Sequence, residues 1–314
     1  MRVLVVGASG VIGRSAVRRL LASGHRVIGT TRTPSKSRHL EALGVEPVVV
    51  SLLDADAVAR EVQRTQPEVV VNMVTDLSAP PNFRILDKSF RSTNALRTTG
   101  TDVLLEASRR AGAARYIGQS FAGWFAAPDQ GARLADETAG IWTSPPRSAR
   151  RTSGALRHLE DRVLNTEGVS GTILRFGPLY GPGTSMGAGG AVLDDVRRRR
   201  IPIVGGGDGT WSFTHVEDAG RAVAVAVDDQ TVAGLFHVVD DNPAPVSEWL
   251  PYLAKALDAP APRTMPVWLA RPAIGAFGVH VMTSARGVDN KQIRSHGFDL
   301  TFPSWRRGFL EGLG

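Results

Sequence analysis

Val3-Leu-Val-Val-Gly7-Ala-Ser-Gly10-Val-Ile-Gly13 opens the chain, and the helical pattern Arg14 to Ser23 follows it. Glycine permits a tight turn at Gly7, close approach of backbone to a pyrophosphate at Gly10 and close helix packing at Gly13. The N-terminus of the helix adds free amides and a positive dipole. The stretch therefore predicts a dinucleotide site. The residues expected to form it are Gly7, Ser9, Gly10, Val11, Ile12 and Gly13.

Apolar runs and amphipathic helical patterns alternate along the first half of the chain. Strands are expected at 2–6, 26–30, 46–50, 68–74 and 114–118, and helices at 13–23, 35–43, 54–65 and 98–111. A helix at 152–167, a strand at 170–176 and a strand near 234–239 continue the pattern. This alternation is typical of an α/β fold with a Rossmann-type, doubly wound parallel sheet.

The second half of the chain is less regular. We expect a Rossmann domain over 1–176, with its sheet completed by about 212–241, and a smaller C-terminal substrate-binding lobe over 177–211 and 242–314. The stretch 123–151 holds several Gly and Pro residues and two Trp residues. A long irregular stretch inside a compact domain is usually a functional loop or a lid.

Composition narrows the functional classes. The 314 residues are 42% hydrophobic and include no cysteine, which excludes disulfides, thiolate metal sites and a cysteine nucleophile. No His, Asp and Glu residues share metal-ligand spacing, so no metal is expected. Residue 1 lies almost on the first strand, and the apolar stretch Pro272 to Met282 is shorter than the roughly 20 residues that span a bilayer. We expect a cytoplasmic protein with no membrane partner.

A net charge of +7 raises the question of nucleic acid. The basic residues are scattered except for Arg197 to Arg200, which end an expected helix begun by Asp194 and Asp195. That order suits the helix dipole, so a solvated helix end explains the run. No nucleic-acid partner is expected.

Four further stretches carry a family resemblance. They are Leu104-Leu-Glu-Ala-Ser-Arg-Arg-Ala-Gly-Ala-Ala-Arg-Tyr-Ile117, Leu174-Arg-Phe-Gly-Pro-Leu-Tyr-Gly-Pro182, Phe213-Thr-His-Val-Glu-Asp-Ala219 and Phe302-Pro-Ser-Trp305. With the Gly-x-x-Gly-x-x-Gly spacing, they make the chain resemble the extended short-chain dehydrogenases/reductases, the NAD-dependent epimerase/dehydratase family, along nearly its whole length. The resemblance implies a nicotinamide dinucleotide cofactor. It also makes His215 a structural residue that ties the sheet to the lobe.

In this fold an acid at the end of the second strand favours NAD. Here that position holds Thr31, followed by Arg32, which favours NADP, with NAD as the alternative if Arg32 is only a surface residue. Ser51 stands where the family usually has aspartate at the adenine. Besides the glycine turn, the expected cofactor contacts are Arg32, Lys36, Ser51, Leu52, Val74, Thr75 and Pro178.

The resemblance implies a Tyr-x-x-x-Lys pair and a serine or threonine as catalytic groups. Counting back from Glu160, Thr152 stands at the tyrosine position and Leu156 at the lysine position. Phe121 takes the serine position, with Ser120 one residue before it. Arg97 replaces the asparagine usual on the fourth helix, although Asn94 lies one turn earlier. The usual proton donor is thus missing, and other groups must serve or no redox turnover occurs.

Asp76, Ser120 and Tyr180 are our candidates for a replacement catalytic group. Each has a structural alternative, because Asp76 can cap a turn and Tyr180 belongs to a motif whose tyrosine usually packs. Pro178 and Trp211 replace the asparagine and arginine that commonly hold the diphosphate of a nucleotide-sugar. We therefore expect a hydrophobic small molecule, such as a terpenoid, polyketide or aromatic metabolite. The expected substrate-lining residues are Phe121, Trp124, Arg147, Thr152 and Trp211, unless the aromatic ones simply pack beneath the loop.

Two classes of function follow. The first is an atypical NADP-dependent enzyme, either a reductase with a non-standard proton donor or a non-redox isomerase, dehydratase or cyclase. The second is a catalytically silent, NADP-binding sensor or regulatory protein. A homodimer is left open.

Overall fold

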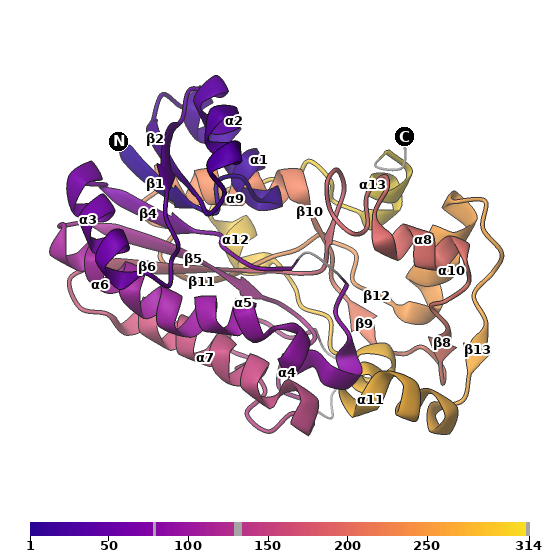
Figure 1. The fold of residues 1–314 in the computed structure, drawn as a ribbon. Helices are drawn as coiled ribbons and strands as arrows, with labels where there is room; N and C mark the ends of the chain where they lie inside the picture. Colours follow the sequence, from indigo (N-terminus) through magenta and orange to yellow (C-terminus); the bar gives the residue numbers. More distant parts are fainter. Residues whose placement is uncertain (78–79, 129–133, 312–314) are drawn as a thin grey trace.

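The computed structural model describes residues 1–77, 80–128 and 134–311 and is built on one parallel sheet (Figure 1). The sheet has seven strands in the order β11-β6-β5-β4-β1-β2-β3. The strands are β1 (Arg2–Val6), β2 (Arg26–Thr31), β3 (Glu46–Val49), β4 (Val69–Asn72), β5 (Arg115–Phe121), β6 (Ser170–Phe176) and β11 (Gly234–Val238). The strand order reverses between β1 and β4, which opens a crevice beyond their carboxyl ends.

Helices cover both faces of the sheet. One hydrophobic cluster joins the sheet to α1 (Val11–Ala22), α2 (Ser37–Ala42), α9 (Val216–Asp228) and α12 (Lys291–Ser295). The cluster on the other face joins it to α3 (Ala55–Thr65), α6 (Thr101–Arg110) and α7 (Arg150–Asn165). The predicted doubly wound parallel sheet is therefore confirmed.

A third cluster lies beyond the strand ends, in the lobe on the right of Figure 1. Its helices are α8 (Ala191–Arg197), α10 (Val246–Ala256), α11 (Val267–Thr283) and α13 (Trp305–Glu311). Its strands pair two by two, as β7 (Leu179–Tyr180) with β10 (Thr214–His215), β8 (Ile203–Val204) with β13 (Thr264–Met265), and β9 (Thr210–Trp211) with β12 (Ala244–Pro245). The division of the chain into the two expected domains stays a prediction.

Short helical turns complete the chain and differ most from the sequence-based expectations. They are η1 (Pro34–Lys36), η2 (Phe83–Ile85), α4 (Leu86–Ser89), α5 (Arg91–Ala95), η3 (Leu96–Gly100) and η4 (Arg147–Ala149). The helix expected at 98–111 begins as the π-helical turn η3 and continues as α6. The strand expected at 68–74 ends at Asn72, whose Oδ1 accepts a hydrogen bond from the Val74 amide at 3.3 Å and so turns the chain.

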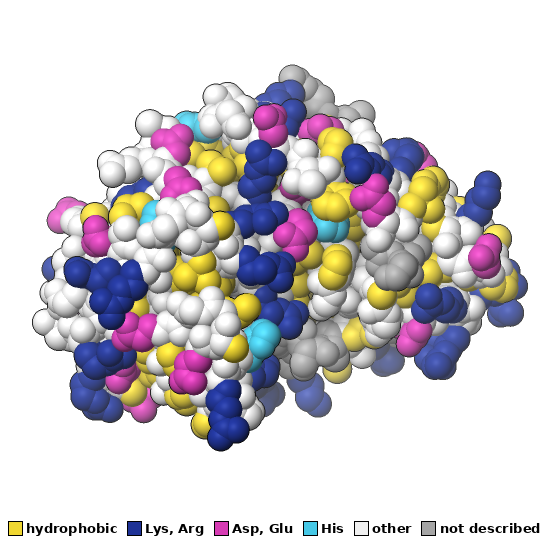
Figure 2. Space-filling model, turned by 90° about the horizontal axis from the view of Figure 1, so that it is seen from above, with side chains coloured by type: hydrophobic (Ala, Val, Ile, Leu, Met, Phe, Trp, Pro, Cys, Tyr) yellow, Lys and Arg dark blue, Asp and Glu magenta, His cyan; other side chains and the backbone are white. Residues whose placement is uncertain are grey.

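Basic side chains are prominent on the surface. Figure 2 shows a band of Lys and Arg side chains down the middle of the upper face, among scattered charges of both signs. At the end of α8, Arg197 lies 3.3 Å from Asp194 and Arg200 lies 3.4 Å from Asp195. Within the described part of the chain, no helix has the length and apolarity needed to cross a membrane.

Candidate functional site

The glycine turn between β1 and α1 has the geometry of a phosphate cradle. Gly7 adopts a φ of +83°, and a Cβ there would lie 3.1 Å from the backbone of Val74. A Cβ on Gly13 would collide with the carbonyl oxygen of Gly7. No side chain caps the N-terminus of α1, and its first turn holds no acid. The turn therefore leaves backbone amides and the positive end of a helix dipole free for an anion such as a pyrophosphate.

A cavity of about 1030 Å³ runs from this turn into the lobe. Of the expected cofactor contacts, those that line it are Gly7, Ser9, Gly10, Val11, Ile12, Arg32, Lys36, Leu52, Val74, Thr75 and Pro178. Of the expected substrate contacts, Phe121, Trp124 and Trp211 line it. The expected residues that do not line it are Gly13, Ser51, Arg147, Thr152, Asp76, Ser120 and Tyr180. Gly13 instead allows the close packing of α1 that the glycine motif requires, and Ser51 and Arg147 are exposed.

Asp76 lies beside the lining residue Arg32 and is engaged by other side chains. Its Oδ1 lies 2.9 Å from Nη2 of Arg32. Hydrogen bonds from Ser92 and Arg32 hold the pKa of this carboxyl below its usual range. Because Asp76 does not line the cavity and its carboxyl pairs with Arg32, the structure does not support it as the replacement proton donor.

Ser120 points away from the cavity because side chains alternate along β5. Its Oγ donates a hydrogen bond of 2.6 Å to Glu160 on α7. Glu160 also forms a buried ion pair with Arg175, with both oxygens accepting bonds of 2.7 Å. The flanking residues Gln119 and Phe121 face the cavity instead. Ser120 is therefore a structural link between β5 and α7 rather than a catalytic group.

Tyr180 is fully buried in the lobe and does not reach the cavity. Its ring packs edge-on against Phe213, His215 and Phe309, with centroids 6.3, 5.0 and 5.3 Å away. Burial raises the pKa of its hydroxyl, so Tyr180 is a weaker acid than an exposed tyrosine. This excludes the third catalytic candidate.

The helix α7 supplies neither a tyrosine nor a lysine, as its sequence shows. Thr152 is fully buried, donates a hydrogen bond of 2.8 Å to Asp87 and accepts one of 3.1 Å from Asn94. Leu156 is fully buried in the lobe cluster. Thr152 is thus an anchor for the start of α7 and not a substrate contact, contrary to expectation.

Aromatic rings form one wall of the cavity. Trp124 contacts the rings of Phe121, Phe83 and Trp211 at centroid distances of 5.0, 5.3 and 4.7 Å. Trp211 packs at 4.6 Å on Trp249. The indole N–H of Trp211 donates to the carbonyl oxygen of Val281 at 3.0 Å. The polar edge of this indole is therefore occupied, and its ring offers the cavity an apolar surface.

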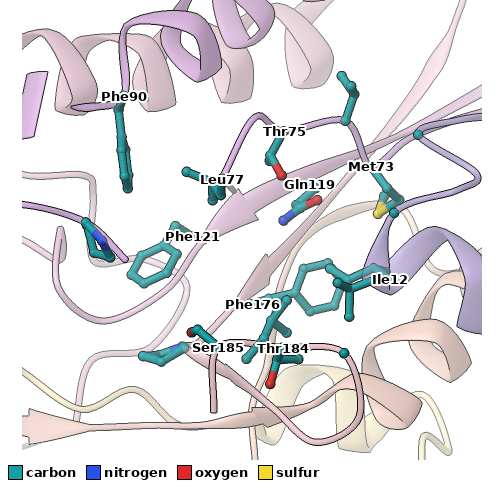
Figure 3. A pocket seen from close by; sticks show the side chains of 18 of the residues that line it. Ile12, Met73, Thr75, Leu77, Phe90, Gln119, Phe121, Phe176, Thr184 and Ser185 are labelled. Atoms are coloured by element: carbon teal, nitrogen blue, oxygen red, sulfur yellow. The ribbon is translucent and has the colours of Figure 1, made fainter. Parts of the chain in front are cut away.

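The close view of the pocket shows how the strand ends contribute (Figure 3). Phe121 and Phe176 lie on either side of the space, with Gln119 and Thr75 above it and Thr184 and Ser185 below it. The sequence analysis missed several lining residues, namely Phe83, Phe90, Gln119, Phe176, Thr184, Ser185 and Trp249. The places of Gln119 and Phe176 near the ends of β5 and β6 could have revealed those two, since ligands bind beyond strand ends.

The ionisable groups that line the cavity are few. They are Arg32, Lys36, Glu61, Arg97, Asp195 and Arg200. No tyrosine or histidine of the described residues lines it, and the chain has no cysteine. Among the described residues, no cluster of acids and histidines could hold a metal ion. The cavity wall thus combines cations, aromatic rings and uncharged polar groups.

Comparisons with known proteins agree with this geometry. The family model for the NAD dependent epimerase/dehydratase family matches residues 3–237. The chain is 41% identical over 314 residues to a 3-diazoavenalumate denitrifying reductase from Streptomyces sp, covering 98% of this chain and 99% of the relative. It is 25% identical to a 4-hydroxy-2-methyl-3-oxo-4-farnesyl-3,4-dihydroquinoline-1-oxide ketoreductase from Stigmatella aurantiaca, covering 81% of this chain and 72% of the relative.

Solved structures show the same fold. A human epimerase family protein with NADPH has a TM-score of 0.77 and 19% identity, covering 99% of both chains. The UDP-glucose 4-epimerase of Thermus thermophilus with NAD has a TM-score of 0.75 and 23% identity, covering 99% of this chain and 97% of its own. With the family model matching most of the sequence and the fold shared along its length, the chain belongs to the NAD-dependent epimerase/dehydratase family.

Proposed function

We propose that this protein is an NADP(H)-dependent reductase of an aromatic or conjugated small molecule. Three findings support this proposal. The chain shares 41% identity with a reductase whose name places a diazo group on its substrate. Aromatic side chains line the cavity next to the dinucleotide cradle. Among the described residues, no tyrosine, histidine or cysteine lines the cavity to give the proton that reduction of a ketone requires.

The residues present fit a nicotinamide dinucleotide. The glycine turn and the N-terminus of α1 would hold the pyrophosphate, and the apolar slot at Leu52 would take the adenine. Arg32 and Lys36, both in the cavity wall, would bind a 2′-phosphate on the adenosine ribose. When bound in its reduced form, this cofactor supplies one hydride.

The absence of a tyrosine, histidine or cysteine among the described residues of the cavity wall is the observation that carries the proposal. Alcohol and amide side chains such as Thr75, Ser185 and Gln119 are poor acids. The substrate that suits this wall best accepts a hydride without taking a proton from a tyrosine, histidine or cysteine. An aryl diazonium ion meets that demand, because replacing its diazonium group by hydride forms an aryl C–H bond and releases dinitrogen.

The chain's own residues then bind, orient and exclude water. Phe121, Trp124 and Trp211 provide flat apolar surfaces on which an aromatic ring can stack. Burial among these rings keeps water from a reactive cation. Pro178 and Trp211 offer no polar group for a diphosphate, which disfavours nucleotide-sugars.

The test uses 4-hydroxybenzenediazonium and NADPH deuterated at C4 of the nicotinamide. We expect release of dinitrogen and transfer of deuterium to the aromatic ring of the phenol product. Val11→Asp is the matched control, because it places a carboxylate in the acid-free first turn of α1, where it repels the pyrophosphate. Phenol without deuterium, or the same rate with Val11→Asp as with the wild type, would contradict the proposal.

A silent sensor is the second candidate, and the same lack of a proton donor favours it. Tight NADPH binding without deuterium transfer to the diazonium ion, or to a conjugated ketone of similar size, would select the sensor over the reductase.

A further inference from the structure

Arg97 is a buried cation in the wall of the cavity. It lies in the π-helical turn η3 and is only 5% exposed. Its guanidinium forms no hydrogen bond or ion pair with any described residue, and its Nε and Nη1 are buried without a partner. The terminal Nη2 is the nitrogen that is not enclosed. A guanidinium in this state still needs acceptors.

Two other buried arginines in this protein have hydrogen-bond acceptors for their guanidinium groups. Arg115 donates hydrogen bonds to the carbonyl oxygens of Ala226, Val227 and Asp229. Arg175 forms two bonds of 2.7 Å with Glu160. Arg97 has neither arrangement, although burying an unpaired charge is unfavourable.

No acid among the described residues pairs with Arg97. Burial lowers its pKa to about 10, so the group stays protonated at neutral pH. The charge of Glu160 acts on it from a distance. Both oxygens of Glu160 are already engaged, by Arg175 and by Ser120. A partner for Arg97 must therefore come from the cavity, and the charge of a desolvated guanidinium selects an anion.

The anionic groups of the cofactor belong elsewhere. Leu96, next to Arg97, packs in the same cluster as Leu52, where the uncharged adenine would lie. The phosphate cradle lies at the start of α1, whose residues pack on the opposite face of the sheet. The 2′-phosphate would meet Arg32 and Lys36. The riboses and the carboxamide of the cofactor are neutral, so an anion at Arg97 is most consistent with the substrate.

We propose that Arg97 binds an anionic oxygen of the substrate, from a carboxylate or a phenolate, and so orients an aromatic acid in the cavity. This inference rests on the proposed function, since it names the substrate class of the same cavity. It adds that the substrate is an organic anion and not a neutral hydrophobic molecule. Arg97 is then a specificity-determining residue for substrate orientation.

The experiment measures binding without turnover, by calorimetry in saturating NADP⁺. The probes are 4-hydroxycinnamate, its methyl ester and 4-methoxycinnamate, titrated at neutral pH and again at about pH 9, where part of the phenol is ionised and Arg97, with a pKa of about 10, keeps most of its charge. We expect the wild type to bind at least one oxyanion form tenfold or more tightly than the probe in which that oxygen is methylated. Loss with the ester identifies the carboxylate, and loss with the methoxy compound at high pH identifies the phenolate.

Arg97→Gln should remove that preference, and Arg97→Lys should keep part of it. Arg200→Gln is the matched control, because Arg200 also lines the cavity but already pairs with Asp195 at 3.4 Å. It should leave the preference unchanged. If Arg97→Gln does not fold, the comparison of methylated and free probes on the wild type still decides.

Two results overturn the inference. One is that the wild type binds each oxyanion no more tightly than the matching methylated probe. Failure of the anions to bind at all counts as the same result. The other is a loss of NADP⁺ affinity in Arg97→Gln as large as its loss of anion affinity, which would assign Arg97 to the cofactor. Deuterium transfer with no preference for an anion would remove this inference and leave the reductase proposal intact. An anion preference without deuterium transfer would support the role of Arg97 and contradict the reductase proposal.

Discussion

At the proposed cofactor end of the cavity, a protein carboxylate and a cofactor phosphate would compete for the same arginine. Arg32 is half exposed and pairs with Asp76 at 2.9 Å, while Thr31 uses its hydroxyl to accept a hydrogen bond from the Thr33 amide at 3.2 Å. A 2′-phosphate that approaches Arg32 must share it with a carboxylate that stays ionised. Discrimination between NAD and NADP is then a balance of two residues.

Arg32→Ala should weaken NADPH binding and spare NADH, because a charge-assisted phosphate contact contributes about 1.5–3 kcal/mol. Asp76→Asn should strengthen NADPH binding by about two- to fivefold, since an exposed ion pair contributes less than about 1 kcal/mol. Titrating both cofactors against the wild type and both variants checks this. Equal affinity of the wild type for NADH and NADPH would refute an NADP preference.

Thr152 provides a second prediction at this scale. Thr152→Ala removes its hydrogen bonds to Asp87 and Asn94 and leaves buried polar atoms unpaired. The free energy of unfolding should therefore decrease by about 1–3 kcal/mol. Turnover of any substrate should stay within about threefold, because no proton transfer is removed. Denaturant unfolding and steady-state rates measure the two effects, and a hundredfold loss of kcat would assign Thr152 a chemical role.

How much of the structure could be predicted from the sequence depends on the type of secondary-structure element. The strands of the main sheet are buried apolar runs, and their parallel order follows from the helices between them. The two-residue strands of the lobe leave no such pattern, and they carry Trp211 and Tyr180. Ser120 failed as a candidate because the two faces of β5 differ by one position. Phe83 and Phe90 lie in or beside short helical turns, which are too short to give a hydrophobic periodicity in the sequence.

The contact between β11 and β6 should make the free energy of unfolding depend on pH. His237 on β11 is buried beside Arg175, and this burial, together with the charge of Arg175, lowers its pKa to about 3. In the unfolded chain the pKa is about 6.5, so below that pH the unfolded state takes up a proton that the folded state does not.

The free energy of unfolding should accordingly decrease by about 1.4 kcal/mol per pH unit between pH 6 and pH 4 from this residue alone. Glu137 accepts a hydrogen bond from the His237 amide, and burial raises the pKa of its carboxyl. Urea unfolding across this pH range measures the slope. His237→Gln should flatten it, and a slope that is the same in both proteins would contradict the assignment.

Across the whole molecule, the cavity joins the proposed cofactor cradle on the sheet to an aromatic wall in the lobe. The cofactor and then an aromatic ligand should therefore each increase the free energy of unfolding. In saturating NADPH, aromatic acids at 100 times their Kd should add about 2.7 kcal/mol, whereas UDP-glucose should add none. Trp211→Arg should weaken the aromatic ligand by leaving a poorly solvated charge among the rings. Thermal-shift measurements test both, and stabilisation by UDP-glucose at micromolar concentration would show that Pro178 and Trp211 do not exclude a nucleotide-sugar.

The stack of Trp124, Trp211 and Trp249 has an optical consequence. Its ring centroids are 4.7 and 4.6 Å apart, and all three rings line the cavity. Indoles this close share their electronic excitation, and a reduced nicotinamide in the same cavity absorbs where they emit. We therefore expect the tryptophan emission to decrease when reduced cofactor binds and to recover when the cofactor is oxidised in place.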